Sequence, residues 1–188
     1  MACCGGREPS PGDEEELVPQ GWESVTVEDQ DAQRHPLGSL LSVRPTVVAF
    51  FYTRCPNPNK CSLTIKQLAE VQRLLIDQSI EDEVGILALS YDPGYDGPER
   101  LLRYGQDRGI RFGPTARLAR AVAGHDQLRA GFRLRVGYRD TIVNRHAIEV
   151  FLVDSAGAIV ATWARRRWDP AEIVGRAAGL AAGAEGDT

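Results

Sequence analysis

The sequence predicts a single α/β domain, because segments with strand character alternate along the chain with segments of helical periodicity. Residues 47–52 form a continuous run of β-branched and aromatic residues, which predicts a central strand buried on both faces of a covered sheet. After Ser62, apolar residues recur at the spacing of a helix. A chain of 188 residues is long enough for one domain with a substantial core and too short to favour two.

The elements around the central strand follow from simple patterns. Residues 23–28 alternate valine with polar residues, which predicts a short strand. Residues 29–36 are polar and predict a turn. After residues 47–52 comes a loop with two prolines, and the first predicted helix begins at Ser62. The apolar residues that share one face of this helix are Ile65, Leu68, Val71 and Leu75.

The middle of the chain repeats the order of strand and helix. Residues 82–91, with the core VGILALSY, predict a second buried strand, and the DPGYDG that follows it directly has turn chemistry. The segment PERLLRYGQDRG predicts a helix, with Pro98 near its start and Gly109 beyond its end. Residues 115–132 predict a third helix, which is interrupted at Gly124.

The C-terminal part predicts a hairpin and a closing helix. Residues 147–153 and 158–163 predict two strands that the turn DSAG joins. The closing helix is predicted over residues 170–180, with Asp169 as its N-cap and Pro170 in its first turn.

The order of these elements best matches a thioredoxin-like fold, a central mixed β-sheet flanked by helices. Cysteines that stand directly after a buried strand and at the start of the next helix support this match. The predicted domain covers residues 21–183. Residues 1–20 are rich in glycine, proline and acidic residues and predict a disordered tail, and residues 184–188 predict a flexible one.

Composition excludes several classes of protein. A net charge of −4 and a pI near 5.4 argue against a nucleic-acid-binding protein, which usually carries a large basic excess. Arg165–Arg167, between two tryptophans, is the main basic cluster, and we interpret it as a solvated face or a partner patch. No apolar run approaches the roughly 20 residues that span a bilayer, so membrane association is not supported. The N-terminus lacks the pattern of a secretory signal, which predicts a cytoplasmic protein, with Cys3 and Cys4 as exposed thiols.

The segment FFYTRCPNPNKCSLT carries the candidate chemistry. Cys55 follows a buried strand and Cys61 precedes a helix, and open α/β sheets place their ligands at such positions. The helix dipole, Arg54 and Lys60 favour thiolates, so we expect both thiol pKa values to be lowered, that of Cys61 more. The spacing C-x5-C matches neither the redox motif C-x2-C nor a structural zinc pair. A metal site and a redox disulfide both remain open.

A third candidate ligand is His146, which stands directly before the strand predicted over residues 147–153. In a thioredoxin-like fold that loop lies against the loop that carries Cys55 and Cys61. Two thiolates and one imidazole form a soft donor set that suits copper, Cu(I) in particular. His35 lies in a predicted turn and His125 follows a helical break, so we do not expect either to bind metal.

The segments VVAFFYTRC, LSYDP and RHAIEVFLVDSAG, with the cysteine at the helix start, resemble the Sco/SenC family of copper-handling thioredoxin-like proteins. The resemblance covers about residues 23–180. It implies copper bound by Cys55, Cys61 and His146, thiol-disulfide activity through the two cysteines, and a role in cytochrome c oxidase assembly. It also implies a membrane anchor outside the cytoplasm. Asp92 resembles a family position near the site, although we interpret it as a turn or cap residue.

The family pattern is C-x3-C followed by proline, whereas this chain has C-x5-C followed by serine. The longer loop can alter the copper geometry or favour disulfide chemistry. Three hypotheses follow: a copper metallochaperone that delivers its metal to a receiving protein, a thiol-disulfide oxidoreductase that uses Cys55 and Cys61, and a thioredoxin-like module with a residual disulfide. A peroxidase is disfavoured because Thr53 lies two residues before Cys55, where peroxiredoxins place the threonine three before.

Overall fold

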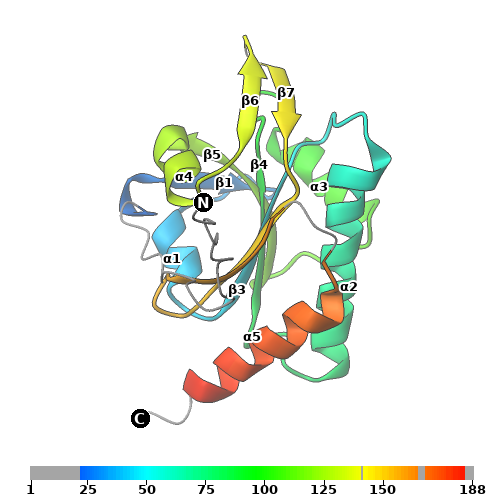
Figure 1. Ribbon diagram of the computed structural model, residues 1–188, viewed down its shortest axis with the longest axis vertical. Coiled ribbons are helices and arrows are strands. Elements are labelled where there is room, and N and C mark those ends of the chain that lie inside the picture. The colour runs from blue at the N-terminus through cyan, green and yellow to red at the C-terminus, as the bar shows by residue number, and fades with distance from the viewer. Residues whose placement is uncertain (1–21, 141, 165–167, 185–188) are drawn as a thin grey trace, which may run out of the picture.

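The computed structural model describes residues 22–140, 142–164 and 168–184. Within them a seven-stranded mixed sheet has the order β2-β1-β5-β4-β3-β8-β9, and β6 and β7 pair separately (Figure 1). Strands β3, β4 and β5 are parallel to one another, and the other neighbours are antiparallel. The strands are β1 Thr26–Asp29, β2 Arg34–Pro36, β3 Thr46–Phe51, β4 Gly85–Ser90, β5 Ala116–Ala123, β6 Val136–Arg139, β7 Ile142–His146, β8 Glu149–Val153 and β9 Ile159–Ala164.

Helices cover both faces of the sheet. The helices are α1 Leu37–Leu41, α2 Leu63–Asp77, α3 Pro98–Gln106, α4 His125–Gly131 and α5 Pro170–Ala184. Helices α1 and α4 lie on one side, α2 and α3 lie on the other, and α5 packs against α2 (Figure 1). The predicted α/β class, a mixed sheet flanked by helices, is therefore confirmed. No helix in the described part of the chain is long and apolar enough to cross a bilayer.

Strand β3 is the centre of the core, and its position decides where the cysteine loop begins. All six of its residues are buried, because β4 and β8 flank the strand and helices cover both faces. The predicted apolar face of α2 is also confirmed, since Ile65, Leu68, Val71 and Leu75 are all buried. The buried strand and the buried helix face together fix both ends of the loop that carries the cysteines.

The prediction of a third helix over residues 115–132 is wrong in its first half. Residues 116–123 form β5, between β1 and β4, and only His125–Gly131 is helical. Alanine and arginine are strong helix formers, but here distant partners outweigh that local preference. Arg117 and Arg120 of β5 form ion pairs with carboxylates of β1.

The predicted break at Gly124 is real. Its φ is 73°, and a Cβ there would lie 2.5 Å from the carbonyl oxygen of Ser24. Only glycine fits this left-handed turn and the close approach of the neighbouring backbone. The turn therefore separates a strand from a helix rather than two parts of one helix.

Four short elements were also predicted incorrectly or missed. Residues 34–36 form β2 rather than a turn, and α1 was not predicted because five residues carry too little periodicity. The hairpin β6–β7 was missed because one face of it is polar, so it lacks an apolar run. Strand β8 begins at Glu149, two residues after the predicted start.

The C-terminal elements agree with the prediction. The Asp154 carboxylate accepts hydrogen bonds from two backbone N–H groups of the turn, and Gly157 has φ 84°. Asp169 caps α5 by accepting a hydrogen bond from the Ala171 backbone at 3.0 Å. Residues 1–20 and 185–188 lie outside the described residues, so the predicted tails stay predictions.

Replacing Asp29 is expected to destabilise the edge of the sheet. Its fully buried carboxylate lies 2.7 Å from Arg117 Nη1 and 2.9 Å from His35 Nε2, and it accepts two backbone hydrogen bonds. Asp29→Asn should lower the free energy of unfolding by about 3 kcal/mol, because it removes the buried anion with which the partly buried Arg117 pairs. Asp77→Asn is the control, since the exposed Asp77–Arg73 pair is worth less than about 1 kcal/mol.

The effect of Asp29→Asn depends on pH. Burial acts to raise the pKa of Asp29, but hydrogen bonds from His35 and the backbone, with the Arg117 charge, outweigh it and lower the pKa. The stabilisation is therefore complete above the ordinary carboxyl pKa and is lost as pH falls through the lowered value. Urea denaturation at neutral and at acid pH measures this, and an equal difference between the two proteins at both pH values would contradict it.

Candidate metal centre

The cysteine loop leaves the buried end of β3 and returns to the start of α2. Cys55 is half-buried in this loop, and its backbone N–H donates to the Tyr52 carbonyl oxygen. The chain then forms one helical turn, Pro58–Ser62, that leads directly into α2 and contains a kink at Lys60. Cys61 lies in this turn and is only 2% exposed. The prediction that Cys61 stands at the start of a helix is thus confirmed.

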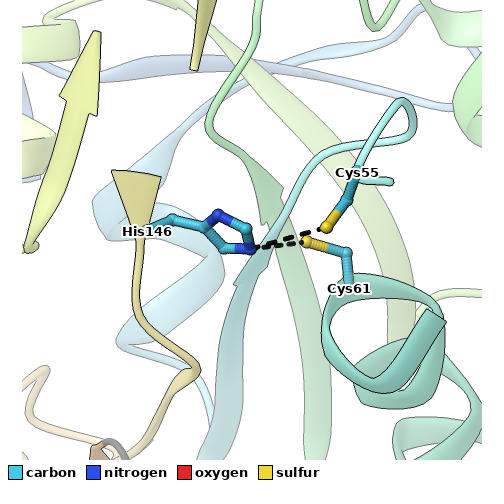
Figure 2. Close-up of side chains that lie close together, drawn as sticks. All are labelled: Cys55, Cys61 and His146. Atoms are coloured by element: carbon cyan, nitrogen blue, oxygen red, sulfur yellow. Dashed lines mark hydrogen bonds between the residues drawn. The ribbon is translucent and has the colours of Figure 1, made fainter. Parts of the chain in front are cut away.

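Three donor atoms converge at this point, and each comes from a different element (Figure 2). His146, the last residue of β7, directs its Nε2 toward both sulfur atoms. Nε2 lies 3.3 Å from Cys61 Sγ and 3.7 Å from Cys55 Sγ. The three donor atoms all lie within 4.8 Å of one another, and no other group of histidine, cysteine and carboxylate residues in the described chain forms such a cluster.

The spacing of these atoms fits a single metal ion. Typical lengths of about 2.3 Å for a metal–thiolate bond and about 2.0 Å for a metal–imidazole bond place trigonal S and N donors about 3.7 Å apart. The observed S–N distances of 3.3 Å and 3.7 Å are close to this value. The donor set, two sulfurs and one nitrogen, is soft. The site can therefore hold a soft ion with small movements of its side chains.

The two extra residues of the loop do not separate the cysteines. Asn57 accepts a hydrogen bond from the Asn59 backbone at 2.9 Å and so caps the helical turn, which begins at Pro58, three residues after Cys55. That turn takes up the added length and returns Cys61 to the neighbourhood of Cys55. The spacing C-x5-C is thus compatible with one compact group of donors.

The two thiols differ in a way that the sequence predicts wrongly. A hydrogen bond from the Cys61 thiol lowers the pKa of Cys55 to about 5, against burial and with help from backbone hydrogen bonds and His146. Donation of the same hydrogen bond, together with burial, raises the pKa of Cys61 far above its ordinary value. We expected Cys61 to be the more acidic thiol because of the helix start and Lys60. In the structure, its burial and its role as donor outweigh both effects.

His146 is prepared to act as a neutral ligand. Burial and the positive charge of Lys60 lower its pKa, and the Cys55 thiolate opposes them without cancelling their effect. Its ring lies between the rings of Tyr52 and Tyr91, with centroids 5.1 and 5.7 Å away. Lys60 Nζ donates to the His146 carbonyl oxygen at 3.2 Å and so ties the histidine to the cysteine loop.

Two residues that the sequence analysis did not single out, Tyr91 and Glu149, support His146. The Tyr91 hydroxyl donates to the buried carboxylate of Glu149 at 2.7 Å, and that carboxylate also accepts a hydrogen bond from the Arg135 backbone at 3.0 Å. Glu149, the first residue of β8, therefore connects the start of the β6–β7 hairpin to Tyr91, which follows β4. A carboxylate inside the apolar run IEVFLV was the signal that could have identified this residue.

Arg54 does not act on the thiols as the sequence suggested. Its guanidinium binds the buried Asp92 carboxylate at 2.7 Å and stacks over the Tyr95 ring. Asp92 is the turn residue that we expected, since its carbonyl oxygen accepts from two backbone N–H groups, but its side chain also positions Arg54. Asp96, also missed, holds the start of the loop through the backbone and hydroxyl of Thr53.

The remaining candidates lie elsewhere, as expected. His35, in β2, binds Asp29, and His125 begins α4 next to the Tyr138 ring. Cys3, Cys4 and the basic cluster 165–167 lie outside the described residues.

The geometry of the site agrees with the family to which the sequence is related. The sequence profile of the SCO1/SenC family matches residues 28–182, which is most of the chain. The chain belongs to the SCO1/SenC family. The resemblance that the cysteine and histidine segments predicted is therefore confirmed. No curated protein sequence matches the chain significantly.

Solved SCO1/SenC structures share the fold at low sequence identity. A family lipoprotein from Bacillus anthracis is 18% identical, with a TM-score of 0.73, over 89% of this chain and 98% of that one. Copper-bound ScoI from Bradyrhizobium japonicum is 21% identical, with a TM-score of 0.64, over 84% and 97%. BsSco, a Sco-family cytochrome c oxidase assembly protein with a disulfide switch, is 18% identical, with a TM-score of 0.72, over 89% and 96%.

Proposed function

We propose that this protein is a copper metallochaperone that holds Cu(I) through Cys55, Cys61 and His146. The observation that carries the proposal is the convergence of two sulfurs and one imidazole nitrogen within 4.8 Å of one another. Membership of the SCO1/SenC family and the copper bound to ScoI support it. We infer that the receiver is a partner such as cytochrome c oxidase, and that residues 21–183 act as one domain.

The three donor groups differ in their protonation before copper binds. Cys55 is already a thiolate near neutral pH and supplies the first strong donor. Cys61 must release its proton when copper arrives, so binding at neutral pH releases one proton from this thiol. The lowered pKa of His146 favours its neutral form, which is the form of imidazole that binds metal.

Delivery follows from the small number of ligands and the half-exposed position of Cys55 and His146. A donor atom from the receiving protein can add to the metal before a donor of this chain leaves. Ligand exchange of this kind needs no oxidation or reduction of the copper. Because Cys61 is buried, it would bind the metal from the protein side, and Cys55 and His146 would face the receiver.

A second function is favoured by the asymmetry of the two thiols. In a thiol-disulfide oxidoreductase, the Cys55 thiolate attacks a partner disulfide and the first partner thiolate leaves. Cys61, once deprotonated, attacks Cys55 Sγ, releases the second partner thiolate and forms the Cys55–Cys61 disulfide. The disulfide switch of BsSco supports this alternative.

The cytoplasmic location stays a prediction, and the Bacillus anthracis relative is a lipoprotein.

Titration with Cu(I) against a competing chelator tests the metallochaperone. Reduced protein in which Cys3 and Cys4 are replaced by serine should bind one equivalent. His146→Ala should weaken binding by about tenfold or more, which corresponds to at least about 1.4 kcal/mol. His125→Ala is the matched control and should leave the affinity unchanged, because this histidine lies on α4 away from the sulfurs. Equal affinity in all three proteins would exclude His146 as a ligand.

The same protein separates the two functions. A metallochaperone binds Cu(I) tightly whether or not it exchanges disulfides. If Cu(I) is not bound competitively but the Cys55–Cys61 pair reduces a model disulfide, the oxidoreductase is the function. If neither occurs, both proposals fail.

A further inference from the structure

The β6–β7 hairpin projects from the sheet and carries His146 at its base (Figure 1). Val136 pairs with His146 and Gly137 with Arg145, but the register then shifts so that Tyr138 pairs with Val143. Residues directly opposite one another share a face of the hairpin. Successive residues of a strand point to opposite faces, so Arg145 and His146 lie on opposite faces of the hairpin, and the extra residue in β7 places Val143 on the same face as His146.

The two faces have different surroundings. The inward face is buried or partly buried: Val136 is 8% exposed, Val143 is 4% exposed, and the Tyr138 hydroxyl donates to the Tyr91 carbonyl oxygen at 2.7 Å. The outward face is exposed, and pairing and alternation assign four side chains to it. They are Arg135, Arg139, Ile142 and Arg145.

The outward face concentrates positive charge on a protein whose net charge is −4. Several arginines elsewhere have carboxylate partners, as in the pairs Arg54–Asp92 and Arg103–Glu99. Within the described chain, no ion pair involves any of the three outward arginines. The hairpin itself holds only one carboxylate, Asp140 at its tip. An exposed cluster of unpaired guanidinium groups is available to bind carboxylates of another molecule.

We propose that this outward face of β6–β7 is a docking surface for the acidic surface of a partner protein. Arg139 ends β6 and Arg135 directly precedes this strand, so an extended backbone separates them by about 13 Å, and Arg145 lies opposite Gly137. Arginine binds carboxylates in a bidentate manner and is enriched at protein interfaces, and Ile142, 53% exposed, provides an apolar contact among the charges.

A protein partner fits this surface better than a lipid bilayer. Basic segments that bind anionic lipids usually cluster four to eight lysines or arginines, whereas this face has three arginines in a fixed register. Docking here would bring the partner to the hairpin whose base carries His146, on the face opposite to the His146 side chain. That consequence for copper delivery depends on the proposed function, whereas binding of an acidic surface does not.

The test measures binding of a dye-labelled polyglutamate peptide to metal-free protein that lacks Cys3 and Cys4. R135E/R139E/R145E should bind the peptide about tenfold or more weakly than the parent, and R135Q/R139Q/R145Q should show a smaller loss. The affinity of the parent should fall steeply with added salt. The matched control is K66E/R100E/R111E, which makes the same change in net charge at exposed positions on and near α2 and α3 and should lose less.

Three results would overturn the proposal. One is equal binding by the parent and both hairpin variants. Another is an equal loss in the control, which would mean that net charge alone is sensed. The last is tighter binding to vesicles that contain phosphatidylglycerol than to the peptide, with both depending on the same arginines. That result would identify the face as a lipid-binding surface. Because the assay contains no copper, failure of the metallochaperone proposal would not change its outcome.

Discussion

Cys61→Ser is expected to lower the affinity for Cu(I) by about a thousandfold or more, a larger loss than that expected for His146→Ala. Cu(I) prefers soft thiolate donors, and a serine hydroxyl is a hard donor that stays protonated at neutral pH. Cys61 is also the buried donor, 2% exposed, so water cannot easily take its place behind the metal. Competition with a Cu(I) chelator measures the loss, in protein in which Cys3 and Cys4 are already replaced.

Cys55→Ser is the comparison within the site. Its loss should be of the same order, because it also leaves only one thiolate and one imidazole as donors. Serine nearly preserves the volume of either cysteine, so a circular dichroism spectrum like that of the parent should confirm the fold. If Cys61→Ser kept the affinity of the parent, copper would be held elsewhere and the donor cluster would serve disulfide chemistry alone.

The sequence was sufficient to locate the loop that carries the two cysteines. Residues 47–52 carry a continuous apolar pattern, and such a pattern depends on burial of both faces of a strand, which β3 shows. The helix after Ser62 likewise buries the face that its periodicity indicated. Because these signals are local, the positions of Cys55 and Cys61 at the two ends of one loop could be predicted.

The elements that depend on distant partners could not be predicted in the same way. Residues 116–123 have helix-forming composition, yet β5 forms because β1 and β4 flank it and Glu28 and Asp29 bind its arginines. The support of His146 by Tyr91 and Glu149 joins residues 58 positions apart, and no local pattern reports such a contact.

The acidity of the thiols shows why site chemistry also needs the structure. Proximity in sequence suggested that Arg54 and the helix start would favour thiolates at both cysteines. In the structure Arg54 is held by Asp92, and one thiol donates to the other, so that their pKa values move in opposite directions. A hydrogen bond between two buried groups outweighs charges that are closer in sequence but face elsewhere.

Iodoacetamide should modify Cys55 much faster than Cys61 in reduced, metal-free protein, and at a far lower pH than an ordinary thiol. Because the pKa of Cys55 is lowered to about 5, its thiolate predominates above that pH and is lost only as pH falls through it. A free cysteine reaches the same fraction of thiolate near pH 8.5. Cys61 is protected both by its raised pKa and by its burial.

Peptide mapping by mass spectrometry across the pH range gives both rates. Cys61→Ala removes the hydrogen bond that contributes most to the low pKa of Cys55, so the midpoint of the Cys55 rate should move upward, toward that of a free thiol. His146→Gln should move it less, because the charge of His146 is the smallest of the causes. Faster labelling of Cys61, or a midpoint near pH 8.5 in the parent, would show that the two thiols do not share a proton as the structure indicates. That result would also contradict both roles proposed for Cys55, the attacking thiol of the oxidoreductase and the first thiolate donor to copper.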